Sequence, residues 1–110
     1  MAADRLQQLL SFLENAPKDS FLLFALAKEY ESNGNPEKAL NYYLQIVDYD
    51  PEYVGTYYHL GKLYEKKEAY QEAFSTYKQG MEIAKKIGDK HALSELAEAK
   101  LILGDDEDFE

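Results

Sequence analysis

Apolar residues recur along the chain at intervals of three and four residues. In residues 3–14, Leu6, Leu9, Leu10 and Leu13 follow this spacing, which places them on one face of a helix. Similar spacing returns in five later segments. No run alternates between apolar and polar residues with the period of two that is typical of a strand. The pattern therefore predicts an all-α fold built from six helices.

Prolines, glycines and capping residues divide this pattern into separate helices. Pro17 ends the first helix, because a proline disfavours helical geometry in the residue before it. Asp19 or Ser20 can cap the second helix, Gly34 can end it, and Pro36 suits the first turn of the third. The linkers are short, so consecutive helices should be antiparallel neighbours. We expect helices over residues 3–14, 21–32, 36–50, about 52–66, about 70–87 and 89–103.

A longer period runs through the same positions. Residues 20–51 and 54–85 carry one pattern twice, 34 residues apart. The positions that hold the same residue in both copies are Leu26/Leu60, Lys28/Lys62, Tyr30/Tyr64, Glu31/Glu65, Ala39/Ala73, Tyr43/Tyr77 and Gln45/Gln79. A fixed period of roughly 20 to 50 residues indicates stacked supersecondary units, each unable to bury its apolar face alone. Proteins of this kind usually bind a partner rather than convert a substrate.

The repeated residues resemble a known family. The first copy reads Leu23-x-x-Leu26-Ala27-x-x-Tyr30 and then Ala39-x-x-x-Tyr43, and the second reads Tyr57-x-x-Leu60-Gly61-x-x-Tyr64 and then Ala73-x-x-x-Tyr77. This spacing resembles the tetratricopeptide repeat, as found in small proteins of bacterial type. The residues just quoted are expected to form the packed core of the repeats, with the small ones placed where two helix backbones come close.

The resemblance implies a right-handed α-α superhelix of antiparallel helix pairs. Pro17 precedes Pro51 by the same 34 residues, so the first helix is expected to be a half repeat. We expect one domain over residues 1–104, made of that half repeat (3–14), two full repeats (20–53 and 54–87) and a capping helix (89–103). Three residues depart from the family pattern: Leu23 replaces a tryptophan, Ile46 a small residue, and Lys85 a proline. Without that proline, the fifth helix should continue past the end of its repeat.

Composition excludes several classes of protein. The net charge of -9 comes from 21 acidic and 12 basic residues, and five of the acids lie in residues 105–110, which are expected to form a disordered tail. An acidic chain with no basic stripe argues against a nucleic-acid partner. No stretch approaches the roughly 18 apolar residues that would span a membrane. With no cysteine the chain has no disulfides, which fits a reducing compartment. We therefore predict a soluble, cytoplasmic protein.

Candidate chemistry is sparse. His59 and His91 lie far apart in sequence, and neither has a second histidine or a carboxylate at metal-ligand spacing. No serine lies in a glycine-flanked nucleophile turn, and no glycine-rich loop is suited to phosphate. The acidic run lacks the glycine and distal glutamate of a calcium loop. We expect no catalytic activity, no cofactor and no metal.

The family resemblance implies that the first helix of each repeat lines a shallow concave groove. The candidate groove residues are Phe21, Phe24, Lys28, Glu31, Tyr58, His59, Lys62 and Glu65. They suit a short peptide with acidic and apolar side chains. Phe24 and Tyr58 stand where the family's chaperone-binding members carry part of their carboxylate clamp, so that clamp is not expected here.

Other interpretations stay open. The lysines can be ordinary surface residues, with Phe21 and Phe24 packed under the first helix. A structural alternative is a weak homodimer, formed through a flank or by docking of the tail around Phe109 into a groove. An enzyme or ligand-binding site between the helices ranks below both.

Overall fold

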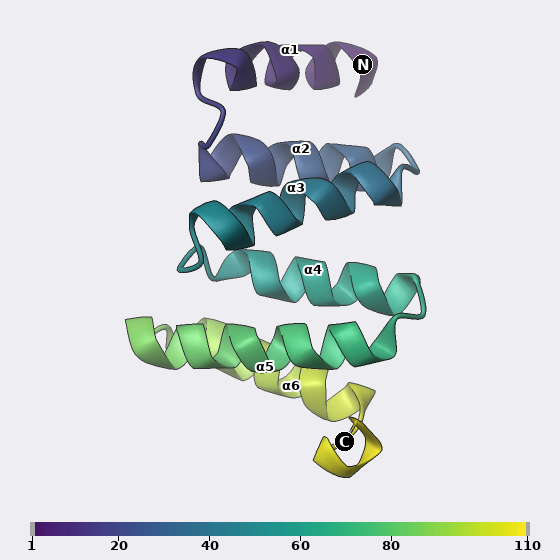
Figure 1. The fold of residues 1–110 in the computed structure, drawn as a ribbon, viewed down its shortest axis with the longest axis vertical. Helices are drawn as coiled ribbons and strands as arrows, with labels where there is room; N and C mark the ends of the chain where they lie inside the picture. The colour runs from purple at the N-terminus through teal and green to yellow at the C-terminus, as the bar shows by residue number, and fades with distance from the viewer. Residues whose placement is uncertain (1, 110) are drawn as a thin grey trace. The chain divides into compact units, whose positions relative to one another are not determined.

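The computed structural model describes residues 2–109, with the side chains of residues 4–109. The helices are α1 (Ala2–Asn15), α2 (Ser20–Ser32), α3 (Pro36–Tyr49), α4 (Gly55–Lys66), α5 (Tyr70–Ile87) and α6 (Lys90–Leu103), followed by a short 3-10 helix, η1 (Asp106–Phe109). There is no strand in this part of the chain. The all-α helical repeat fold predicted from the spacing of apolar residues is therefore confirmed (Figure 1).

The chain divides into two compact units at the boundary between the two expected repeats. The first unit ends at Tyr53 and contains α1, α2 and α3. The second begins at Val54 and contains α4, α5, α6 and η1. Each unit is built around an antiparallel helix pair, α2 with α3 and α4 with α5 (Figure 1).

In the first unit, the core lies between α2 and α3. The side chains of Leu23, Leu26, Ala27, Ala39, Tyr43 and Ile46 are all fully buried there, and Tyr30 is buried close to them. The start of α2 is joined to the residue after α3, because the Ser20 hydroxyl donates to the Asp50 carboxylate over 2.6 Å. Helix α1 contacts α2, where Arg5 Nε lies 3.2 Å from Glu29 Oε1.

In the second unit, glycines allow three helices to come close together. A Cβ added at Gly61 on α4 would overlap the Tyr77 ring on α5. A Cβ at Gly80 on α5 would lie 2.5 Å from Tyr57 Cβ on α4 and 3.0 Å from Leu96 Cδ1 on α6. The expected core residues Tyr57, Leu60, Gly61, Ala73 and Tyr77 are buried, whereas Tyr64 is half-buried. Gly80, which was not among the expected packing residues, is therefore the point where α6 approaches the pair.

The helix starts settle one open point and change another. Of the two caps expected for α2, Asp19 or Ser20, the structure has Asp19, whose carboxylate accepts from the Leu22 amide over 3.0 Å. Helix α4 begins at Gly55 rather than near Glu52, because the chain first makes a turn closed by the Tyr53 amide and the Asp50 carbonyl, 3.0 Å apart.

The long fifth helix agrees with the sequence. Tyr49, the last residue of α3, corresponds to Ile83 in the 34-residue register, but α5 continues to Ile87. Lys85 supplies the backbone amide that a proline would lack. Gly88 then ends the helix with a left-handed backbone, φ 78°.

Residues 105–110 were expected to form a disordered tail. Glu110 lies outside the described residues, and over 105–109 the structure differs from this expectation. Asp106–Phe109 form one turn of 3-10 helix. The Phe109 ring stacks on Phe74 of α5 with the ring centroids 4.4 Å apart. The acidic composition predicted a solvated tail, but Phe109, the one aromatic residue in the acidic run, makes a tertiary contact with α5.

Candidate functional site

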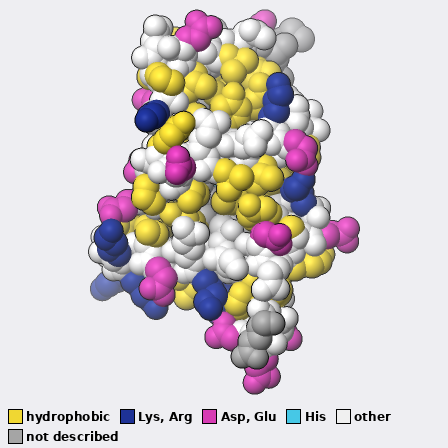
Figure 2. All heavy atoms as spheres, in the orientation of Figure 1, with side chains coloured by type: hydrophobic (Ala, Val, Ile, Leu, Met, Phe, Trp, Pro, Cys, Tyr) yellow, Lys and Arg dark blue, Asp and Glu magenta, His cyan; other side chains and the backbone are white. Residues whose placement is uncertain are grey.

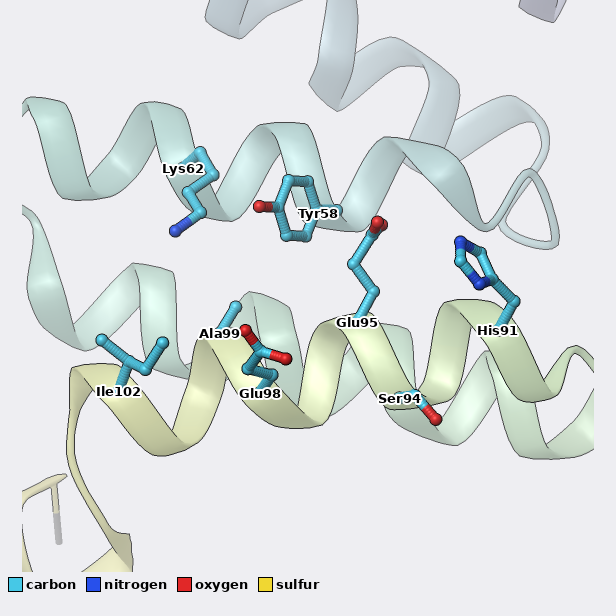
Figure 3. A pocket seen from close by; sticks show the side chains of 8 residues that line it. All are labelled: Tyr58, Lys62, His91, Ser94, Glu95, Glu98, Ala99 and Ile102. Carbon is cyan, nitrogen blue, oxygen red and sulfur yellow. The ribbon is translucent and has the colours of Figure 1, made fainter.

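The candidate site is a pocket of about 350 Å³ between α4 and α6, inside the second unit. Tyr58 and Lys62 point from α4 toward α6, and Glu95 points from α6 toward α4 (Figure 3). The pocket combines an aromatic ring, a cation, two carboxylates and an apolar end. It is lined by Tyr58, Lys62, His91, Ser94, Glu95, Glu98, Ala99 and Ile102.

The pocket exists because α6 presents two different faces. Leu96 and Ala99 are buried against the rest of the unit. His91, Glu95, Glu98 and Ile102 recur at intervals of three and four residues and form the second face, which lines the pocket. Asp89 fixes the start of the helix, because its carboxylate accepts from the Ala92 amide over 2.9 Å.

The pocket has more acidic than basic side chains, Glu95 and Glu98 against Lys62. Lys62 is already engaged on its own helix, since its Nζ lies 5.5 Å from the centre of the Tyr58 ring and 3.8 Å from Glu65 Oε2. Glu95 and Glu98 form no ion pair with any residue that the structure describes. The pocket therefore has uncompensated negative charge beside an aromatic ring.

Glu31 and Glu65, two of the expected groove residues, have an internal partner. The Tyr43 hydroxyl donates to Glu31 over 2.5 Å, and the Tyr77 hydroxyl donates to Glu65. Burial first, and then the bond to the carboxylate, raises the pKa of both tyrosines well above its ordinary value. The repetition of these two glutamates thus has a structural cause, because each accepts from a core tyrosine that is also repeated.

The other expected groove residues differ in their environments. Tyr58 and Lys62 line the pocket, while His59 does not and instead lies with its ring edge-on to Tyr58, centroids 5.6 Å apart. In the first unit Phe21 is 69% exposed and Lys28 is exposed. Phe24 is half-buried and packs against the rings of Tyr43 and Tyr53, at 6.0 and 5.9 Å.

Sequence reasoning missed the contribution of α6. It treated residues 89–103 only as a cap, so His91, Glu95 and Glu98 were not among the candidates. The available signal was their helical spacing, which puts them on one side of a helix whose other side carries Leu96 and Ala99.

The wider surface is mixed in character. Hydrophobic side chains reach the face drawn in Figure 2 in separate groups, with basic and acidic side chains among them. Among the described residues, no group of histidines and acids is arranged to hold a metal ion. Over the same residues, every helix is too short or too polar to cross a bilayer.

Comparison with known proteins identifies the repeats. Family profiles described as tetratricopeptide repeat match residues 20–53 and 54–87, the two units expected from the 34-residue period. These matches cover more than half of the chain. No curated protein matches it significantly.

Solved structures give the same result. A tetratricopeptide repeat domain protein from Salinibacter ruber is 47% identical in its solution structure, which covers 79% of this chain and 88% of that one with a TM-score of 0.75. The type III secretion translocator chaperone SycD from Yersinia enterocolitica has a TM-score of 0.82 over 93% of this chain and 71% of its own, at 16% identity. The tetratricopeptide domain of Sgt2 from Aspergillus fumigatus has a TM-score of 0.71 over 89% and 67%, at 22% identity. The last two share the fold alone. The repeat matches and the Salinibacter relative show that the chain belongs to the tetratricopeptide repeat family and is similar to its small bacterial members.

Proposed function

We propose that this protein is an interaction module that binds a short peptide segment of a partner protein in the α4–α6 pocket, without catalytic activity of its own. The family supports the general role, since tetratricopeptide repeats are protein-interaction units. The observation that carries the specific proposal is the pair Glu95 and Glu98, which have no ion-pair partner among the described residues and face an aromatic ring across a pocket.

The pocket suits a basic side chain. Glu95 and Glu98 offer two carboxylates to a cation, and Tyr58 offers aromatic surface beside them, although Lys62 Nζ already lies 5.5 Å from the centre of its ring. Ile102, whose side chain is 74% exposed, supplies apolar surface for the methylene stem of a lysine or arginine. The expected ligand chemistry therefore changes from an acidic peptide to one with a basic residue next to an apolar one.

Peptide selection tests this proposal. A random peptide library is selected against the wild-type chain and against a Glu95→Lys/Glu98→Lys variant. The variant replaces two carboxylates by two ammonium groups, which repel a basic side chain of the peptide. Peptides selected on the wild type should therefore bind the variant roughly ten-fold more weakly or worse. The control variant Asp48→Lys/Glu82→Lys makes the same charge change at exposed positions outside the pocket. Selection of acidic peptides, or equal loss in both variants, would contradict the proposal.

A second candidate function is weak self-association through the end of α6. Leu101 and Ile102 are each 74% exposed there, which is unusual for two adjacent large apolar side chains. Light scattering on the wild type and on Leu101→Lys would test it, with Phe12→Lys as a control at another exposed apolar residue. A monomeric mass in the wild type at every concentration removes this candidate.

A further inference from the structure

Phe74 forms an aromatic platform on α5 with a cationic rim. Its side chain is buried, 4% exposed, with the ring of Phe109 stacked on it at an interplanar angle of 17°. Two lysines approach the same ring, with Nζ of Lys100 on α6 at 4.8 Å from its centre and Nζ of Lys78 on α5 at 5.8 Å. A flat apolar surface with two cations close to it is suited to an aromatic residue that is flanked by acids.

Residues 105–109, here called the acidic segment, make their own turn. The Asp105 carboxylate accepts from the amides of Glu107 and Asp108, at 3.0 and 3.3 Å. The Asp108 carboxylate accepts in return from the Asp105 amide, at 2.9 Å. These bonds lie within the segment, so a separate peptide of the same sequence can form the same turn.

Two residues of the acidic segment have polar contacts with the helices in the part of the chain that the structure describes. Gln71 Nε2 on α5 donates to the Phe109 carbonyl over 2.9 Å. Lys100 Nζ lies 3.6 Å from Asp106 Oδ1, and the aspartate side chain is 68% exposed. An exposed ion pair contributes little stability. The helices thus contact a defined pattern in the segment, an acid followed three residues later by an aromatic ring. Because these contacts are few, we expect the docking to be reversible.

Gly104 lets the segment fold back onto the platform. A Cβ at this position would lie 2.8 Å from Phe109 Cε2 and 2.9 Å from Asp108 Oδ2. Glycine has no Cβ, so Gly104 permits this approach of Phe109 and Asp108.

We propose that the surface formed by Phe74, Gln71, Lys78 and Lys100 is a second binding site, for a partner segment that carries an aromatic residue preceded by acids. The chain's own acidic segment is its resident ligand and covers the site in cis. A short tether gives an effective concentration on the order of millimolar, so an external segment binds only by displacing the resident one. This site is separate from the α4–α6 pocket, and its ligand has the opposite charge.

A labelled peptide with the sequence of residues 104–110 tests the site directly, by fluorescence anisotropy against the full chain. It should bind a Phe109→Ala chain at least about ten-fold more tightly than the wild type, because the resident ring is gone. Adding Gln71→Ala and Lys100→Gln to that chain should weaken binding, and a peptide with the Phe109→Ala change should not bind. Phe12→Ala, which removes another partly exposed ring, should behave like the wild type.

Three results would overturn the proposal. One is equal peptide affinity of the wild-type and Phe109→Ala chains, and another is equal binding of the two peptides. The third is a wild-type dimer that becomes monomeric with Phe109→Ala, since the resident segment would then come from a second copy. If the Phe109→Ala chain does not fold, docking in cis is tested instead by nuclear Overhauser contacts between the Phe74 and Phe109 rings in the monomeric wild type. We expect these contacts, and their absence would contradict docking in cis.

Discussion

The Tyr77 hydroxyl donates a hydrogen bond to the Glu65 carboxylate, linking the core of α5 to the surface of α4. Tyr43 and Glu31 form the same bond in the first repeat, at 2.5 Å. A buried hydroxyl needs a partner, and a carboxylate is a strong acceptor. We predict that Tyr77→Phe lowers the free energy of unfolding by about 1–2 kcal/mol, measured by urea unfolding. A double-mutant cycle with Glu65→Ala should give a clear coupling energy, and a coupling of zero would show that the bond adds nothing.

The same two tyrosines predict a loss of stability in alkaline solution. Their pKa is raised in the folded chain, by burial and then by the glutamate, so the unfolded chain, with tyrosine pKa about 10, loses these protons first. The stabilisation is therefore fully present below about pH 10 and is lost as the pH rises toward the folded pKa. Urea unfolding between about pH 8 and 11 should show a fall above pH 10 that is smaller in Tyr43→Phe/Tyr77→Phe. Tyr49→Phe, at a 42% exposed position, should leave the fall unchanged.

Gly80 predicts a packing cost at the contact of three helices. A single methyl group at this position collides with Tyr57 and Leu96, so Gly80→Ala should destabilise the chain by about 1–3 kcal/mol in spite of the better helix propensity of alanine. Gly55→Ala is the matched control, because nothing lies within 4 Å of the added Cβ, and it should be neutral or stabilising by up to about 1 kcal/mol. Equal melting temperatures for the two variants would contradict the close approach.

Glu68 predicts a gain in stability from one substitution. Its φ is 59°, a left-handed backbone, and the corresponding residue of the first repeat is Gly34, with φ 76°. The left-handed conformation costs a non-glycine residue roughly 1–2 kcal/mol, partly offset by the greater entropy of glycine in the unfolded chain. Glu68→Gly should therefore raise the free energy of unfolding by about 0.5–1 kcal/mol, and the reciprocal Gly34→Glu should lower it. A loss of stability in Glu68→Gly would mean that the Glu68 side chain contributes more than its backbone costs.

Helices and repeats were predictable because their signals are local. Apolar spacing set the faces of the helices, and prolines, glycines and caps set their ends, so the absence of a proline at Lys85 was enough to predict the long α5. The role of Gly80 was not predictable, because it depends on α6 approaching two other helices. The spacing of apolar residues within α5 therefore does not reveal that a third helix packs against it.

The candidate site was predictable only in part. Tyr58 and Lys62 followed from the family's groove positions, but Glu95 and Glu98 come from a helix that does not continue the repeat pattern. Glu31 and Glu65 were expected in the groove because they occupy the family's groove positions, and the hydroxyls that explain their repetition lie on the following helix. Residues 105–109 dock through the Phe109 ring on Phe74, the bond from Gln71 and the ion pair with Lys100. Docking of the tail around Phe109 was expected only as an alternative, because a composition of acids indicates solvation.

The most direct test of the central claim is an amide NMR titration of the wild-type chain with a lysine-containing peptide obtained from the selection. We predict saturable shifts of Tyr58 on α4 and of His91, Glu95 and Glu98 on α6, and their loss in Glu95→Lys/Glu98→Lys. Shifts confined to residues outside the α4–α6 pocket, or shifts that persist in that variant, would contradict the account.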